Sequence, residues 1–129
     1  MKAKVKKVMI VDDNEFDCYI TSKIVTNFDE NIDIMEFNSS ITAIQYLEEF
    51  QNVTAKLPDL ILLDIYMPIL DGFEFIEKFN SLSDTLKKHT KICILSTTVD
   101  DLYIHKAKVD ESVLFSSKPI TKEFVESIF

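Results

Sequence analysis

The stretch VMIVDDNE, from Val8 to Glu15, decides the predicted fold. The apolar run Val8–Val11 is typical of a buried strand, and it ends abruptly in two adjacent aspartates, Asp12 and Asp13. Two neighbouring carboxylates repel each other, and burying either one without a partner costs free energy. We therefore expect a cation beside this pair.

Short apolar runs of the same kind recur along the chain. Near-continuous runs are expected of parallel strands that helices cover on both faces. The run at Ile32–Phe37 is more mixed and is predicted to lie at an edge of the sheet. The predicted strands are Val5–Val11, Ile32–Phe37, Leu60–Leu63, Ile92–Leu95 and Val113–Phe115.

Amphipathic segments with helical spacing separate these runs. Phe16, Ile20, Ile24 and Phe28 recur every four residues in the first segment. The range 98–109 is predicted as a helix because aspartates lie near its start and lysines near its end, which suits the helix dipole. Further apolar positions with helical spacing are Ile44 and Leu47, then Phe75, Ile76 and Phe79, then Phe124, Val125 and Ile128; the predicted N-caps are Ser39 or Ser40 and Thr121. Five βα units of this kind predict a doubly wound α/β fold.

Length, charge and composition exclude several classes of protein. A chain of 129 residues fits one domain, 1–129. Its formal net charge is −8 and its basic residues are all lysines, so no nucleic-acid partner is expected. No apolar stretch is long enough for a membrane span or a signal peptide, so no membrane partner and a cytoplasmic location are predicted. Cys18 and Cys93 lie in apolar segments and are interpreted as reduced core thiols.

Polar residues follow the predicted strands at the points where ligands bind in open parallel sheets, beyond the carboxyl ends. Three carboxylates at one rim suit Mg²⁺ or Mn²⁺, and a lysine with a hydroxyl suits the oxygens of a phosphoryl group. The chain has one glycine and no P-loop, so phosphoryl transfer here would not use that motif. These polar residues are Asp12, Asp13, Asp64, Ser96, Thr97 and Lys118.

The segments IVDDNE, LILLDIYMPILDG, ICILST and LFSSKP resemble the receiver domain of two-component response regulators, which has the chemotaxis-type fold. The resemblance covers essentially the whole chain. Its most specific feature is Asp64, which stands four residues before Pro68 and eight before Gly72. It implies a flavodoxin-like, five-stranded parallel sheet of order 2-1-3-4-5, with helices on both faces.

The resemblance also implies a role for each residue of the metal site. Asp64 matches the residue that accepts the phosphoryl group. Asp13 resembles the principal Mg²⁺ ligand, Asp12 a second acidic contact, and the carbonyl of Tyr66 the backbone ligand. The implied metal ligands are therefore Asp12, Asp13, Asp64 and Tyr66, and Mg²⁺ or Mn²⁺ is the cation expected beside the aspartate pair.

Four more residues match the family pattern around the phosphoryl group. Ser96 resembles the switch hydroxyl, and Lys118 the lysine that pairs with the phosphate. Pro119 resembles the proline that follows a cis peptide bond, and Phe115 the switch aromatic. Asp64, Lys118 and Ser96 are thus the expected catalytic group, and Ser96 with Phe115 the expected switch.

The function implied is transfer of a phosphoryl group to Asp64 from a phosphohistidine, with Mg²⁺. The implied donor is a sensor histidine kinase or a His-phosphotransfer protein, and the modified domain changes its binding surface for an unidentified downstream protein. The domain would catalyse its own phosphorylation and dephosphorylation, although it acts mainly as a signalling switch.

Two other classes of protein share parts of this sequence pattern. A pseudo-receiver interaction module would commonly lose the acceptor, one of the acidic pair or the lysine, and this chain keeps all of them. A haloacid-dehalogenase-like phosphatase needs a second aspartate two residues after Asp64, where this chain has Tyr66.

The chain also departs from the family pattern in three places. Thr97 stands at a position that is usually very small, and we expect it to narrow access to the phosphoryl group. No glycine lies near Asp110, so an altered turn is expected there. The last predicted helix, Thr121–Phe129, is short, and the chain is interpreted either as a stand-alone receiver or as one excised from a longer protein.

Overall fold

The computed structural model describes residues 5–65, 67, 69–96 and 113–129. Five parallel strands form one sheet of order β2-β1-β3-β4-β5, which confirms the predicted topology and the edge position of the second strand. The predicted helix over 98–109, the altered turn near residue 110 and Thr97 lie outside the described residues. The strands are β1 Lys7–Val11, β2 Asp33–Phe37, β3 Leu60–Asp64, β4 Lys91–Ser96 and β5 Leu114–Ser117.

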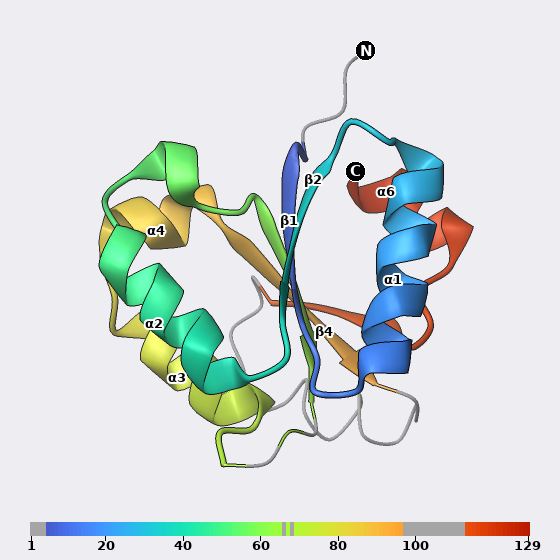
Figure 1. Ribbon diagram of the computed structural model, residues 1–129. Helices are drawn as coiled ribbons and strands as arrows, with labels where there is room; N and C mark the ends of the chain where they lie inside the picture. The colour runs from blue at the N-terminus through green and yellow to red at the C-terminus, as the bar shows by residue number, and fades with distance from the viewer. Residues whose placement is uncertain (1–4, 66, 68, 97–112) are drawn as a thin grey trace.

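Helices cover both faces of this sheet, as predicted (Figure 1). On one face lie α1 (Glu15–Phe28) and α6 (Lys122–Ile128). On the other lie α2 (Ser40–Phe50), α3 (Gly72–Asn80) and α4 (Asp84–His89), together with the short 3₁₀ helix η1 (Thr54–Lys56). The predicted caps are confirmed at Ser39 and Thr121, whose side chains accept hydrogen bonds from the backbone of α2 and α6.

The central strands are buried on both faces, which explains their continuous apolar sequence. In β1, Met9 and Val11 pack in the cluster under α2 and α3, while Val8 and Ile10 pack in the cluster under α1 and α6. This alternation follows from the two-residue period of a strand. Burial of both apolar clusters fixes the register of the strands, and with it the positions at which their carboxyl ends stop.

Helix α4 was not predicted from the sequence. It has six residues, and Leu86 is its one buried residue, so no apolar stripe marks it. Its polar ends indicate why it forms: Ser83 caps the start, and Lys87, Lys88 and His89 lie in the last turn, where the helix dipole favours cations.

Candidate functional site

The predicted site residues that the structure describes lie at the carboxyl ends of the strands. Asp12 directly follows β1, Asp64 is the last residue of β3, Ser96 is the last residue of β4, and Lys118 directly follows β5. Because all five strands are parallel, their carboxyl ends lie on the same side of the molecule. Segments more than a hundred residues apart in the chain thereby contribute to one site.

The turn between β1 and α1 orients Asp12. The backbone N–H of Asp12 donates to the carbonyl of Phe37, which extends the pairing with β2 by one residue. The Asp12 Oδ1 accepts the backbone N–H of Asn14 at 2.9 Å, and Asn14 in turn caps α1 through Asp17 N at 3.0 Å. These bonds hold the Asp12 carboxylate, which is 2% exposed, at the rim of the sheet.

Lys118 is placed by the chain that leaves β5. Its backbone N–H donates to the carbonyl of Ser96 at 2.9 Å, and its peptide bond to Pro119 is cis, as predicted. The Lys118 Nζ lies 2.7 Å from Asp12 Oδ2 and 3.4 Å from Asp64 Oδ1. The lysine therefore joins the ends of β1 and β3 by direct ion pairs.

A third carboxylate at this ammonium group was missed from the sequence. Asp17 Oδ2, from the first turns of α1, lies 2.9 Å from Lys118 Nζ. From the sequence alone, Asp17 is an ordinary acidic residue near a helix start. The available signal was its position in DDNEFD, five residues after Asp12, on the helix whose start borders the site.

The charge state of Lys118 follows from these neighbours. Burial alone would lower its pKa, but hydrogen bonds to Asp12 and Asp17 and the charge of Asp64 outweigh burial and raise the pKa above its usual value. The group is therefore an ammonium at neutral pH. In this structure, Lys118 is thus a cation in direct contact with Asp12, the first of the two adjacent aspartates.

The acidic residues also fit a divalent cation. Carboxylate oxygens of Asp12, Asp13 and Asp64 all lie within 4.8 Å of one another. Asp13 is exposed, whereas Asp64 is only 9% exposed, so the cluster opens to solvent on one side. Mg²⁺ prefers such a site, with one or two carboxylates and its other positions filled by water or phosphate oxygens. Tyr66, the fourth predicted ligand, lies outside the described residues.

The loop after Asp64 depends on the glycine of the motif. The Gly72 N–H donates to the Ile65 carbonyl at 3.0 Å, and a Cβ on Gly72 would lie 3.3 Å from the Ile65 Cα. The chain after β3 therefore packs directly on the start of α3. Asp71 and Glu74 form a capping box there, so the loop ends in a well-fixed helix start.

The two predicted switch residues lie on neighbouring strands. In the register of β4 and β5, Phe115 is opposite Ile94, and Ser117 is opposite Ser96. The two-residue alternation puts Ser96 on the same face of the sheet as Ile94 and Phe115. Ser96 is 2% exposed, and Phe115 is half-buried against the cluster that also contains Ile94.

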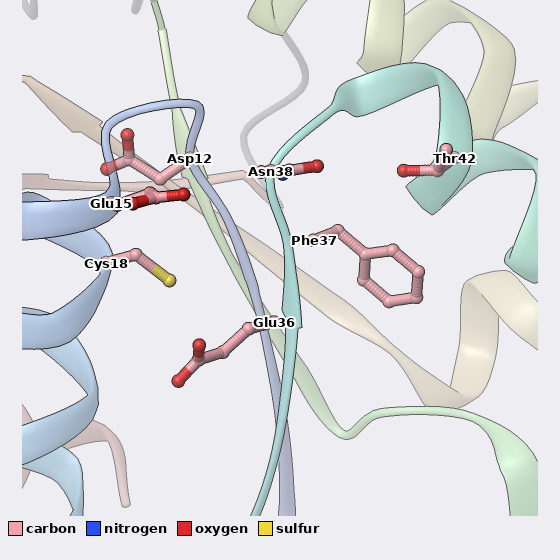
Figure 2. Close-up of a pocket in the computed structure, with 7 residues that line it drawn as sticks. All are labelled: Asp12, Glu15, Cys18, Glu36, Phe37, Asn38 and Thr42. Atoms are coloured by element: carbon pink, nitrogen blue, oxygen red, sulfur yellow. The ribbon is translucent and has the colours of Figure 1, made fainter.

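A hollow lies beside the site, between α1, β2 and α2 (Figure 2). Its volume is about 380 Å³. In it the Cys18 thiol and the Glu36 carboxylate point toward one another, and burial, together with Glu36 and Asp12, raises the Cys18 pKa to about 12. Burial raises the pKa of Cys93 to about 12 as well, so both cysteines are protonated thiols at neutral pH, as interpreted from the sequence. The lining residues are Asp12, Glu15, Cys18, Glu36, Phe37, Asn38 and Thr42.

Known proteins share both this sequence pattern and this fold. The chain is similar to the transcriptional regulatory protein PrrA of Mycobacterium leprae, at 31% identity over 97 residues, which are 74% of this chain and 36% of that protein. It is also similar to the hybrid signal transduction histidine kinase L of Dictyostelium discoideum, at 30% identity over 129 residues, which are 95% of this chain and 7% of that protein. The chain spans only a minor part of the length of each of these relatives.

Solved structures agree with the observed topology. A two component response regulator from Cytophaga hutchinsonii superimposes with a TM-score of 0.85 at 26% identity, over 98% of this chain and 95% of that one. The phosphorylated cyanobacterial phytochrome response regulator RcpA superimposes with a TM-score of 0.72 at 25% identity, over 96% of this chain and 89% of that one. In the described part of the chain, no helix is long and apolar enough to cross a membrane. A family model for the response regulator receiver domain matches residues 8–128, and the chain therefore belongs to the response regulator receiver domain family.

Proposed function

We propose that this receiver domain accepts a phosphoryl group on Asp64 from a phosphohistidine of a sensor histidine kinase or His-phosphotransfer protein. The observation that carries the proposal is the Lys118 ammonium, which lies 2.7 Å from Asp12 and 3.4 Å from Asp64. An acceptor carboxylate, a cation beside it and an acidic cluster suited to Mg²⁺ are what phosphoryl transfer to aspartate requires.

The reaction joins the Asp64 carboxylate oxygen to phosphorus while the bond from phosphorus to the donor histidine nitrogen breaks. The nitrogen keeps that electron pair. Lys118 offsets charge on the transferred group, and its ammonium is held beside Asp64 by its ion pair with the buried Asp12. Bound at Asp12 and Asp13, Mg²⁺ would supply further positive charge to the phosphoryl oxygens. Water later attacks the acyl phosphate, releases inorganic phosphate and restores the Asp64 carboxylate.

The modified state would be read through Ser96 and Phe115. Three phosphoryl oxygens at Asp64 attract a hydroxyl donor. Ser96 can supply it, because it directly follows Leu95, the residue opposite Asp64 on the neighbouring strand β4. Movement of Ser96 would leave space into which the ring of Phe115, on the same face of the sheet, can turn. The surface around β5 would then differ between the two states, and a partner protein could distinguish them.

Two relatives of this chain are hybrid histidine kinases, which supports a histidine kinase as its partner. Hybrid signal transduction histidine kinases L and B of Dictyostelium discoideum both resemble this chain, and 95% and 81% of the chain are covered. A histidine kinase or phosphotransfer protein is therefore the proposed donor.

Intact mass after incubation with Mg²⁺ and acetyl phosphate tests the proposal. The expected result is one added phosphoryl group in the wild type, none in Asp64→Asn and none when EDTA replaces Mg²⁺. Asp33→Asn is the matched control, because Asp33 is an exposed residue of the edge strand β2, and this variant should be modified like the wild type. An unmodified wild type would favour the pseudo-receiver reading, and phosphate mapped to Asp12 or Asp13 would overturn the choice of acceptor.

A further inference from the structure

Lys118 is in contact with more carboxylates than the proposed reaction uses. Its Nζ lies 2.7 Å from Asp12, 2.9 Å from Asp17 and 3.4 Å from Asp64. An ammonium group has three N–H donors, and these three carboxylates can occupy all of them. Once Asp64 carries a phosphoryl group, a phosphoryl oxygen replaces the Asp64 carboxylate as the third partner, and the ammonium can move closer to it only by lengthening its contact with Asp12 or Asp17.

The three contacts differ in how much their loss would cost. Asp12 is 2% exposed, so its release would leave a buried carboxylate without a cation. Asp64 is itself the residue that carries the phosphoryl group. The side chain of Asp17 is 34% exposed at the surface of α1, so water can solvate it when the ion pair opens. Of the two contacts that remain after phosphorylation of Asp64, the one with Asp17 is thus the less costly for Lys118 to give up.

We propose that Asp17 is a positioning residue for Lys118, which it holds in the unphosphorylated domain and releases to a phosphoryl oxygen on Asp64. The inference rests on the proposed function of Asp64. Asp17 acts through the lysine and not on the reacting atoms. Its negative charge also opposes the approach of an anionic phosphodonor, so both effects of Asp17 slow phosphorylation.

Removing the charge of Asp17 should therefore speed phosphorylation. The variant Asp17→Asn keeps the size of the side chain and one oxygen acceptor but loses the charge. Its initial rate with acetyl phosphate, at saturating Mg²⁺ and fixed ionic strength, should be about threefold higher than that of the wild type, in line with a partly exposed ion pair. Asp17→Glu restores a carboxylate and should return the rate to the wild-type value.

Glu15→Gln is the matched control for long-range charge. Glu15 lies in the first turn of the same helix, is exposed, and makes no ion pair with any residue in the described ranges. Its substitution removes the same charge without touching Lys118, and the rate should stay close to that of the wild type. An equal acceleration in Glu15→Gln, or an unchanged or slower rate in Asp17→Asn, would overturn the proposal.

A spectroscopic measurement separates this inference from the proposed function. Without any phosphodonor, the ¹⁵N signal of the Lys118 ammonium should shift in Asp17→Asn and stay in place in Glu15→Gln. If the wild type accepts no phosphoryl group, the proposed function is wrong. The ¹⁵N signal of Lys118 then still shows whether Asp17 positions the ammonium, because it is measured without a phosphodonor. A Lys118 signal that does not respond to Asp17→Asn rules that role out.

Discussion

At the scale of single residues, the site is dominated by one buried cation. The Lys118 side chain is 8% exposed, and its ammonium links the ends of β1 and β3 with the first turn of α1. Transfer of both charges of an ion pair from water is costly, so such a pair is maintained only when geometry and further hydrogen bonds compensate. Here Asp12 gains a backbone N–H from Asn14 in addition to the ammonium.

Loss of the Lys118 charge should destabilise the metal-free domain. Lys118→Met keeps most of the side-chain volume but leaves the Asp12 carboxylate buried without its cation, so urea unfolding in EDTA should show a loss of about 3 kcal/mol. Mg²⁺ should restore more stability to this variant than to the wild type, because a divalent cation can replace the missing charge. The measurement is the unfolding free energy of both proteins with and without Mg²⁺.

The control for this experiment is Lys87→Met. The Lys87 Nζ lies 3.5 Å from Asp84 Oδ1 on α4, but the Asp84 side chain is 84% exposed. Loss of this ion pair in Lys87→Met should therefore change the unfolding free energy by less than about 1 kcal/mol. Equal destabilisation by the two substitutions would contradict the importance assigned to the buried cation. So would a response to Mg²⁺ that is the same in Lys118→Met and the wild type.

The sequence predicted which residues reach the site but not all of their contacts. Asp12, Asp64 and Lys118 follow apolar strands, and the parallel sheet brings such positions together whatever the detail of the loops. The ion pair between Asp17 and Lys118 depends on which face of α1 is turned toward the site and on the conformation of the long lysine side chain. Neither is encoded in apolar periodicity, so this ion pair could be found only in three dimensions.

At the scale of elements, strand ends and helix starts determine the shape of the site. The predicted strands match the observed ones to within two residues at each end, because burial on both faces leaves a continuous apolar run. Helix α4 was not predicted, because a six-residue helix with one buried side chain shows no repeating pattern of apolar residues. Helix α3 shows how capping adds to the apolar pattern: its buried residues Phe75, Ile76 and Phe79 were predicted, whereas its start is fixed by polar bonds.

The start of α3 offers a direct test of this capping. The Asp71 carboxylate accepts the backbone N–H groups of Phe73 and Glu74 at 2.9 and 3.0 Å, and the Glu74 carboxylate accepts the backbone N–H of Asp71 at 3.1 Å. Asp71→Ala leaves these helix N–H groups without their acceptor and should lower the unfolding free energy by about 1 kcal/mol. Chemical denaturation measures this loss.

A matched substitution within the same helix controls for the loss of one acidic side chain. Glu77 is exposed in α3, and Glu77→Ala should change the unfolding free energy by less than about 0.5 kcal/mol. If Asp71→Ala had as little effect as Glu77→Ala, the capping box would not stabilise the loop that follows the acceptor strand.

At the scale of the whole molecule, the sheet separates two apolar clusters, and the site lies at the carboxyl ends of its strands. One cluster lies under α2, α3 and α4, and the other under α1 and α6. Asp64 ends β3, while Phe115 lies two strands away on β5 and packs on the first cluster. In the proposed switch, Ser96 on the intervening strand β4 would couple a change at Asp64 to Phe115.

Phe115→Ala tests whether this route carries the change of state. The phosphorylation rate should stay within about twofold of the wild type, because Phe115 is not among the residues proposed to contact the phosphoryl group. Phosphorylation moves the backbone amide signals of Leu114–Ser117 in the wild type if the proposed switch operates, and these movements should be much smaller in the variant. Since Phe115 is half-buried, its loss should cost less than the approximately 3 kcal/mol of a fully buried phenylalanine, and the variant should fold.

The comparison that isolates the switch is Phe124→Ala. Phe124 is also partly buried, but it packs on the other cluster, under α1 and α6. This variant should lose a similar amount of stability and still show the wild-type movement of the β5 signals on phosphorylation. If Phe115→Ala preserved that movement while losing stability like Phe124→Ala, Phe115 would be a core residue alone, and the coupling from Asp64 to β5 would have to run through other side chains.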